Sequence, residues 1–156
     1  MDRYRLDLPW PVSANDLWAV ATVNGRHRMV LTKAGRRFKD DVGWLARKAG
    51  IVRPLPGRVG ILVEMHPRLP ADARERMRKH GDQWEDRVRA LDLDNVLKAT
   101  IDGLKSIAFG DDNMVWDIHA RRMPPRRVAG LTVEIWPIPY EAPQLDLWTD
   151  GCGNGD

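Results

Sequence analysis

The stretch R-A-L-D-L-D-N-V-L-K-A-T-I-D-G-L, from Arg89 to Leu104, carries residues whose types and spacing could bind a metal ion. Asp92 and Asp94 stand one residue apart, and Lys98 follows Asp94 by four positions. In an extended segment, two aspartates at this spacing project to the same side, and their charges repel unless a cation lies between them. A site made only of carboxylate oxygens favours Mg²⁺, with Mn²⁺ as the alternative.

A second acidic pair, Asp111 and Asp112, stands in F-G-D-D-N, in the turn expected between a helix and the next strand. Taken alone, such a polar turn is ordinary. The first pair also has a plain alternative, in which Asp94 caps a helix, Lys98 pairs with it and Asp92 is solvated. A D-L-D-N-x-x-K motif followed by D-D one helix later nevertheless favours one shared site for a divalent cation.

The helix expected after Asp94 must position both pairs. Its apolar stripe consists of Leu97, Ile101, Leu104 and Ala108, broadened by Val96 and Ile107, and its polar face carries Lys98, Asp102 and Lys105. A helix of about twelve residues carries the chain roughly 18 Å away from Asp94. The residues from Ala108 to Asp111 return at most about 14 Å. Either the helix is short, or a two-fold partner donates Asp112 across an interface, and the second arrangement is slightly favoured.

Patterns elsewhere predict the elements that support this helix. Alternating or apolar runs predict strands at residues 4–9, 26–31, 57–66, 114–122 and 131–137, with an N-G turn at 24–25. Thr32 is the expected N-cap of a helix that ends at Gly50 and has Phe38, Val42, Leu45 and Ala49 on its apolar face. Strands mixed with two main helices predict an α+β fold, a single mixed β-sheet with helices packed against it.

Two segments stand outside this pattern. Residues 68–89 are charged and of mixed sign, and they predict either a short surface helix broken at Gly81 or a loop that orders on binding. Residues 138–156 are acidic and rich in Pro and Gly, which predicts a flexible C-terminal tail. We therefore expect one domain over residues 1–137, with 68–89 as an insertion.

The composition predicts a cytoplasmic globular protein. The chain is 43% apolar and 30% charged, and it has no run of the roughly 20 apolar residues that a membrane span needs. The N-terminus lacks the apolar region of a secretory signal, and the single cysteine, Cys152, cannot form an internal disulfide. Five tryptophans are expected in the core: Trp10, Trp18, Trp44, Trp116 and Trp136.

The charge is distributed unevenly. All 25 Lys and Arg residues lie within the first 127 residues, which hold 17 of the 22 Asp and Glu residues and therefore have a net charge of +8. Such a body suits a polyanionic partner, because neutralised phosphates release counterions. The basic turn M-P-P-R-R at residues 123–127 is a candidate contact for DNA phosphates, with a plain solvated turn as the alternative.

Three motifs resemble those of the RusA-type Holliday junction resolvases, small homodimeric endonucleases of bacteria and their phages. L-P-W-P-V-S-A-N at residues 8–15 is similar to the family's opening L-P-W-P-P-S-x-N. D-L-D-N-V-L-K at 92–98 resembles its central acidic motif, and G-D-D-N-M-V at 110–115 resembles its later D-D motif. Ala14 stands where the family often has a second asparagine, and the insertion 68–89 replaces a short Arg-rich loop.

The resemblance implies Asp92, Asp94 and Asp112 as ligands of Mg²⁺ and, together with Lys98, as the catalytic residues. The candidate DNA contacts are Asn15, Arg89, Arg126 and Arg127. The implied function is a Mg²⁺-dependent endodeoxyribonuclease, a two-fold homodimer that resolves four-way branched DNA by paired symmetric nicks during recombination and repair. The alternatives are a branch- or flap-specific nuclease and a non-catalytic DNA-binding module.

The C-terminal tail contains Q-L-D-L-W, from Gln144 to Trp148. This segment resembles the Q-L-x-L-F motif by which bacterial proteins bind the replicative sliding clamp. Leu145, Leu147 and Trp148 would be its apolar anchors. The alternative is that the segment packs on its own domain.

Overall fold

A computed structural model describes residues 3–141 of the chain. The strands are β1 Tyr4–Pro9, β2 Trp18–Val23, β3 Arg26–Leu31, β4 Arg58–His66, β5 Val115–Arg122 and β6 Gly130–Ile138. The helices are α1 Ala14–Leu17, α2 Lys33–Lys48, α3 Ala73–His80 and α4 Leu93–Leu104, with short 3₁₀ helices η1 Gly81–Arg87 and η2 Asp112–Met114. The predicted α+β class is confirmed.

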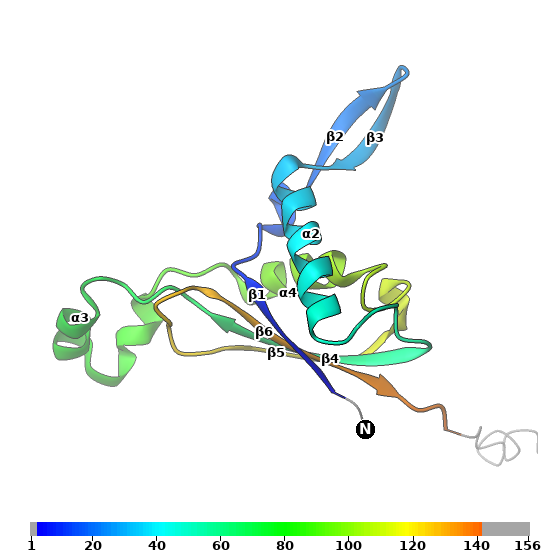
Figure 1. The fold of residues 1–156 in the computed structure, drawn as a ribbon. Helices are drawn as coiled ribbons and strands as arrows, with labels where there is room; N and C mark the ends of the chain where they lie inside the picture. Colours follow the sequence, from blue (N-terminus) through cyan, green and yellow to red (C-terminus); the bar gives the residue numbers. More distant parts are fainter. Residues whose placement is uncertain (1–2, 142–156) are drawn as a thin grey trace, which may run out of the picture.

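The centre of the fold is a four-stranded mixed sheet with the strand order β1-β6-β4-β5. Strand β6 runs antiparallel to β1 and β4, whereas β4 and β5 are parallel and are connected through α4. Helices α2 and α4 cover the same face of this sheet (Figure 1). Strand β5 is an edge strand, because within residues 3–141 it pairs only with β4.

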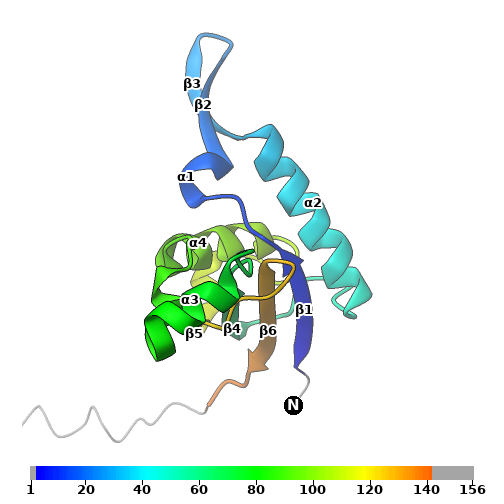
Figure 2. The same cartoon turned by 90° about the vertical axis from the view of Figure 1, so that its left-hand side faces the viewer.

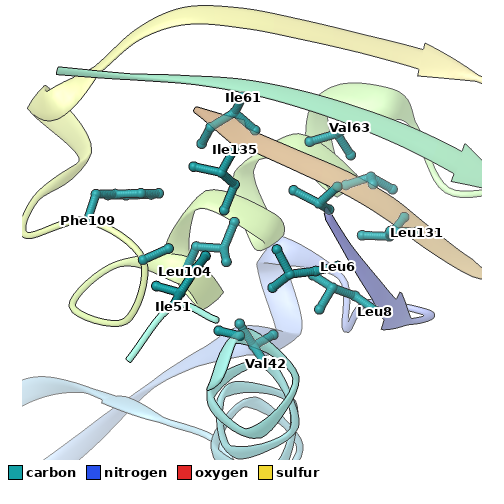
Figure 3. Packing of buried hydrophobic residues seen from close by; sticks show 14 of the residues in the cluster. Leu6, Leu8, Val42, Ile51, Ile61, Val63, Leu104, Phe109, Leu131 and Ile135 are labelled. Atoms are coloured by element: carbon teal, nitrogen blue, oxygen red, sulfur yellow. The ribbon is translucent and has the colours of Figure 1, made fainter. Parts of the chain in front are cut away.

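The hydrophobic core lies between this face of the sheet and the two helices (Figure 3). Alternate residues of three strands point into it: Leu6 and Leu8 of β1, Ile61 and Val63 of β4, and Leu131 and Ile135 of β6. Val42 of α2 and Leu104 of α4 meet them from the helical side. This packing fixes the rotation of α4 and therefore which of its side chains face solvent.

The buried stripe of α4 differs from the predicted one. Its members are Val96, Ala99, Thr100, Gly103 and Leu104. The predicted stripe residues Leu97 and Ile101 are only half-buried. The stripe includes Thr100 because the hydroxyl donates a 2.7 Å hydrogen bond to the carbonyl of Val96, which satisfies it without a distant partner.

A two-stranded ribbon, β2 paired with β3, is present in addition to the predicted sheet. The turn residues Asn24 and Gly25 both have positive φ, 51° and 74°, as a tight hairpin turn of the type I′ class requires. The ribbon projects beyond the start of α2, away from the four-stranded sheet (Figures 1 and 2).

The insertion at residues 68–89 folds into α3 and η1, which confirms the surface-helix alternative. The break falls at Gly81, where φ is 53°. Arg122 of β5 anchors the end of the insertion, since its Nη2 donates to the carbonyls of Val88 at 2.6 Å and of Glu85 at 3.2 Å. None of the helices in the described range is long and apolar enough to cross a membrane.

The prediction for the tryptophans was wrong at two positions. Trp136 is buried, whereas Trp44 and Trp116 are 62% and 58% exposed. Cations cover these two rings in place of a core, with Arg58 3.4 Å from the centroid of Trp116 and Lys48 5.3 Å from that of Trp44.

Candidate metal and DNA-binding site

Asp92 and Asp94 lie at the N-terminal end of α4. Asp92 occupies the N-cap position, and its carbonyl accepts a hydrogen bond from Val96 N at 3.1 Å, so the helix begins one residue later. Asp94 therefore sits in the first turn. Two expectations are corrected: Asp94 is not the cap, and the two aspartates do not share an extended segment.

Within residues 3–141, no residue forms an ion pair or a capping hydrogen bond with the carboxylate of Asp92, and none forms an ion pair with that of Asp94. The Asp92 side chain makes no capping hydrogen bond. Across residues 3–141 neither aspartate forms an ion pair within 4.0 Å, and the expected Asp94–Lys98 pair is absent. The positive end of the helix dipole favours negative charge at this place. Asp92, Asp94 and Lys98 are all exposed, so both carboxylates and the lysine are open to an incoming ligand.

The second acidic pair lies at the other end of α4. Lys105, the C-cap of α4, places Nζ 3.2 Å from Asp111 Oδ2 and 3.3 Å from Asp112 Oδ1. Hydrogen bonding with Asp112 and with Lys105 lowers the pKa of Asp111 to about 2. Hydrogen bonds to Asp111 and to Asp112 raise the pKa of Lys105.

Sequence reasoning placed Lys105 on the polar face of the helix but missed its contact with the acidic turn. The contact forms because the chain folds back after the helix, with Ser106 N donating to Phe109 O at 2.8 Å. Helical periodicity carries no information about such a return. The only signal was the spacing of a lysine six and seven residues before two aspartates.

A single chain does not gather all three predicted metal ligands. Asp94 and Lys105 are eleven residues apart on α4, which corresponds to about 16 Å along the helix axis. Carboxylate oxygens that share one Mg²⁺ lie within about 4 Å of each other, because each is roughly 2 Å from the ion. Consistent with this separation, residues 3–141 contain no cluster of three or more His, Cys, Asp or Glu side chains that could hold a metal ion.

The donor set nevertheless suits a hard divalent cation, because it consists of carboxylate oxygens alone. Asp92 and Asp94 supply two such groups from the N-cap and the first turn of one helix. Asp112 of the same chain lies beside Lys105 at the opposite end of α4. The sequence left two alternatives, a short helix or a partner that donates Asp112. The helix is not short, because α4 has twelve residues.

The candidate DNA contacts differ in their availability. Asn15 in α1, Arg89 before α4 and Arg127 before β6 are exposed. Arg126 is half-buried, and its Nε is buried without a hydrogen-bond partner among the described residues. Its backbone joins the turn to the start of the insertion, with N donating to Pro67 O at 2.8 Å.

The predicted clamp-binding residues Gln144, Leu145, Leu147 and Trp148 lie outside the described residues.

The fold and the site define an α+β protein with a basic body and exposed carboxylates at a helix start, a combination suited to a nucleic-acid phosphodiester. The family model described as Endodeoxyribonuclease RusA matches residues 9–136. The chain therefore belongs to the RusA endodeoxyribonuclease family, whose activity is on branched DNA junctions. A search of curated proteins found no match.

Proposed function

We propose that this protein is a cytoplasmic, Mg²⁺-dependent endodeoxyribonuclease that resolves Holliday junctions by paired symmetric nicks in recombination and repair. The observation that carries the proposal is the pair of unengaged carboxylates at the start of α4, in a chain of the RusA family. Mg²⁺, or Mn²⁺, held by Asp92, Asp94 and Asp112 would lower the pKa of a water molecule and stabilise the charge of phosphoryl transfer.

The remaining catalytic role falls to Lys98. It stands one turn after Asp94 on the same helix and is exposed, so its ammonium group is available to a bound phosphate. There it stabilises charge that develops on the phosphate or helps to deprotonate the attacking water. The basic body offsets the repulsion between DNA and the acidic site and steers DNA toward it.

We further infer that the protein acts as a two-fold homodimer in which the second copy supplies Asp112. The free edge of β5 is a natural place for two copies to pair. If the two β5 strands pair antiparallel about a two-fold axis, the start of β5 in one chain lies beside the end of β5 in the other.

This pairing would bring the separated ligands together. The end of β5 carries Arg122, whose Nη2 donates at 2.6 Å to the carbonyl of Val88, four residues before Asp92. Asp112, three residues before the first residue of β5, would thus move toward Asp92 and Asp94 of the partner. A dimer with two such sites matches the near two-fold symmetry of a four-way junction.

The direct test is nicking of a synthetic four-way junction with and without Mg²⁺. We expect symmetric cuts only with the metal ion, loss of cleavage with retained binding in Asp94→Asn, and a decrease of roughly 10²-fold or more in Lys98→Ala. Undiminished cleavage by Asp94→Asn would refute the catalytic site. Equal affinity for a junction and for linear duplex would argue against junction recognition, and faster cutting of flaps would favour the flap-nuclease alternative.

A further inference from the structure

The β2–β3 ribbon and the start of α2 carry most of the net positive charge of residues 1–127. Between Asp16 and Asp40 the chain contains no acidic residue. It contains six cations there, namely Arg26, Arg28, Lys33, Arg36, Arg37 and Lys39. This net charge of +6 compares with +8 for the whole of residues 1–127. Within residues 3–141 none of the six forms an ion pair.

The ribbon also exposes apolar side chains that its own domain leaves uncovered. Val20 and Met29 are opposite each other in the strand register and are 66% and 61% exposed. Val23, which is 41% exposed, lies opposite Arg26 beside the turn. A two-stranded hairpin gains little stability by itself, so a projecting ribbon is more stable when a partner covers it. The exposed apolar side chains suit a groove that encloses them, and the cations suit a partner that is anionic.

The base of the ribbon is locked to the start of α2. Thr32 closes the ribbon through its N, which donates to Leu17 O at 3.0 Å, and its Oγ1, which donates to Asp16 O at 2.7 Å. The same hydroxyl oxygen caps α2 by accepting from Gly35 N at 2.9 Å. A Cβ at Gly35 would lie 2.5 Å from Leu17 O, so only glycine permits this close approach. The direction of the ribbon is therefore fixed.

A second contact ties the base of the ribbon to the helix that carries the acidic site. Trp18, the first residue of β2, donates from Nε1 to Asp102 Oδ2 at 3.4 Å. Asp102 stands eight residues after Asp94 on α4, about 12 Å further along the helix axis. The ribbon thus projects from a defined place relative to Asp92 and Asp94.

We propose that the β2–β3 ribbon enters the major groove of a duplex arm of the substrate and holds that arm while the carboxylates of α4 act on the strand at the branch. This inference rests on the proposed function and names a DNA contact outside the residues discussed so far. Arg26 and Arg28 bind phosphates or base edges in the groove. Val20 and Met29 make apolar contacts with thymine methyl groups and sugars.

Size and charge favour DNA over a second copy of the chain as the occupant. The major groove of B-DNA, about 12 Å wide and about 8.5 Å deep, admits a two-stranded ribbon. Each strand of the ribbon has six residues, which gives a length of roughly 20 Å, more than the depth of the groove. Two copies of a segment with a net charge of +6 repel each other.

The test compares the full-length variant Arg26→Gln/Arg28→Gln with wild type and with Arg47→Gln/Lys48→Gln, which removes the same charge from the far end of α2. Binding to duplex and junction DNA is measured by fluorescence anisotropy over a range of salt concentrations without divalent ions. Loss of two phosphate contacts lowers the salt slope by about 1.8 and weakens binding by up to roughly 60-fold at 0.1 M salt. The control variant should match wild type. Equal affinities and slopes for the two double variants would overturn the ribbon contact.

The groove itself is tested with arms that contain glucosylated 5-hydroxymethylcytosine, whose sugars fill the major groove. We expect wild type to bind this DNA as weakly as the ribbon variant binds ordinary DNA, and undiminished binding would refute the groove assignment. Because binding is measured without cleavage, the experiment can refute the ribbon contact without refuting the nuclease function, and the reverse. A wild-type protein that binds through the ribbon but never nicks refutes the nuclease proposal alone, whereas normal nicking by a ribbon variant with unchanged affinity refutes only the ribbon contact.

Discussion

The shared site can be tested by mixing two inactive variants, Asp94→Asn and Asp112→Asn. The structure places Asp94 at the first turn of α4 and Asp112 in contact with Lys105 at its end. The eleven intervening residues span about 16 Å, against the roughly 4 Å that separate two carboxylate oxygens on one Mg²⁺. Even a lysine side chain extended back along the helix recovers less than half of that distance. The shared-site proposal therefore predicts that Asp94 and Asp112 of one chain do not share an ion and that a working site needs both chains.

Counting sites gives the expected magnitude. When the two variants exchange subunits at equal concentration, about half of the dimers contain one chain of each kind. In such a mixed dimer, one site carries both substitutions, and the other combines an unaltered Asp94 with an unaltered Asp112. About one quarter of the wild-type sites are therefore restored. Each mixed dimer has one working site, so it should nick a junction in one strand and not in two.

The assay is the initial rate of nicking on a four-way junction labelled in each strand, after the mixture has been incubated to exchange subunits. A mixture of Asp92→Asn with Asp94→Asn is the matched control, because both substitutions fall in the same half of the site and no intact site can form. If the Asp94→Asn and Asp112→Asn mixture stays as inactive as this control while mass analysis shows mixed dimers, the shared site is wrong.

Three further outcomes are expected, two from the structure and one from the sequence motif in the C-terminal tail. Lys105→Met should raise the pKa of Asp111 from about 2 toward its ordinary value of 3.8, as a carbon-13 titration of the carboxyl group would show. Because the pKa of Asp111 is depressed in the folded state, its contact with Lys105 stabilises the wild-type fold above about pH 4. This contribution is lost as the pH falls toward 2. Gly60→Ala should lower the free energy of unfolding in urea by about 3 kcal/mol, since a Cβ there would lie 2.2 Å from the ring of Trp136. Deleting residues 142–156 should abolish binding to the sliding clamp, measured by surface plasmon resonance, and leave junction nicking unchanged.

Each of these outcomes has a control. Gly110→Ala should change the free energy of unfolding little, because no atom lies within 4 Å of a Cβ at that position. An unchanged Asp111 titration in Lys105→Met would show that the lysine does not hold the acidic turn. Retained clamp binding after the deletion would return the Q-L-D-L-W segment to its alternative, packing on its own domain.

The sequence alone predicted the features that depend on near neighbours. Strand β1 was expected at residues 4–9 and has these bounds, and the helix capped by Thr32 begins where its cap predicts. The acidic motifs and the family were also readable, because they are defined by residue type and spacing along the chain. Alternation, helical period and capping depend on residues close together in the chain, so they can be recognised without knowledge of the rest of the fold.

The tertiary structure decided the features that depend on packing between distant segments. It made Asp92 rather than Asp94 the N-cap, turned α4 so that Ala99 and Gly103 are buried, and joined Lys105 to the acidic turn. It also separated the two acidic motifs by the length of a helix and left the β2–β3 ribbon standing clear of the sheet. None of this follows from local pattern, because the rotation of a helix and the path of a returning loop are set by the core against which they pack.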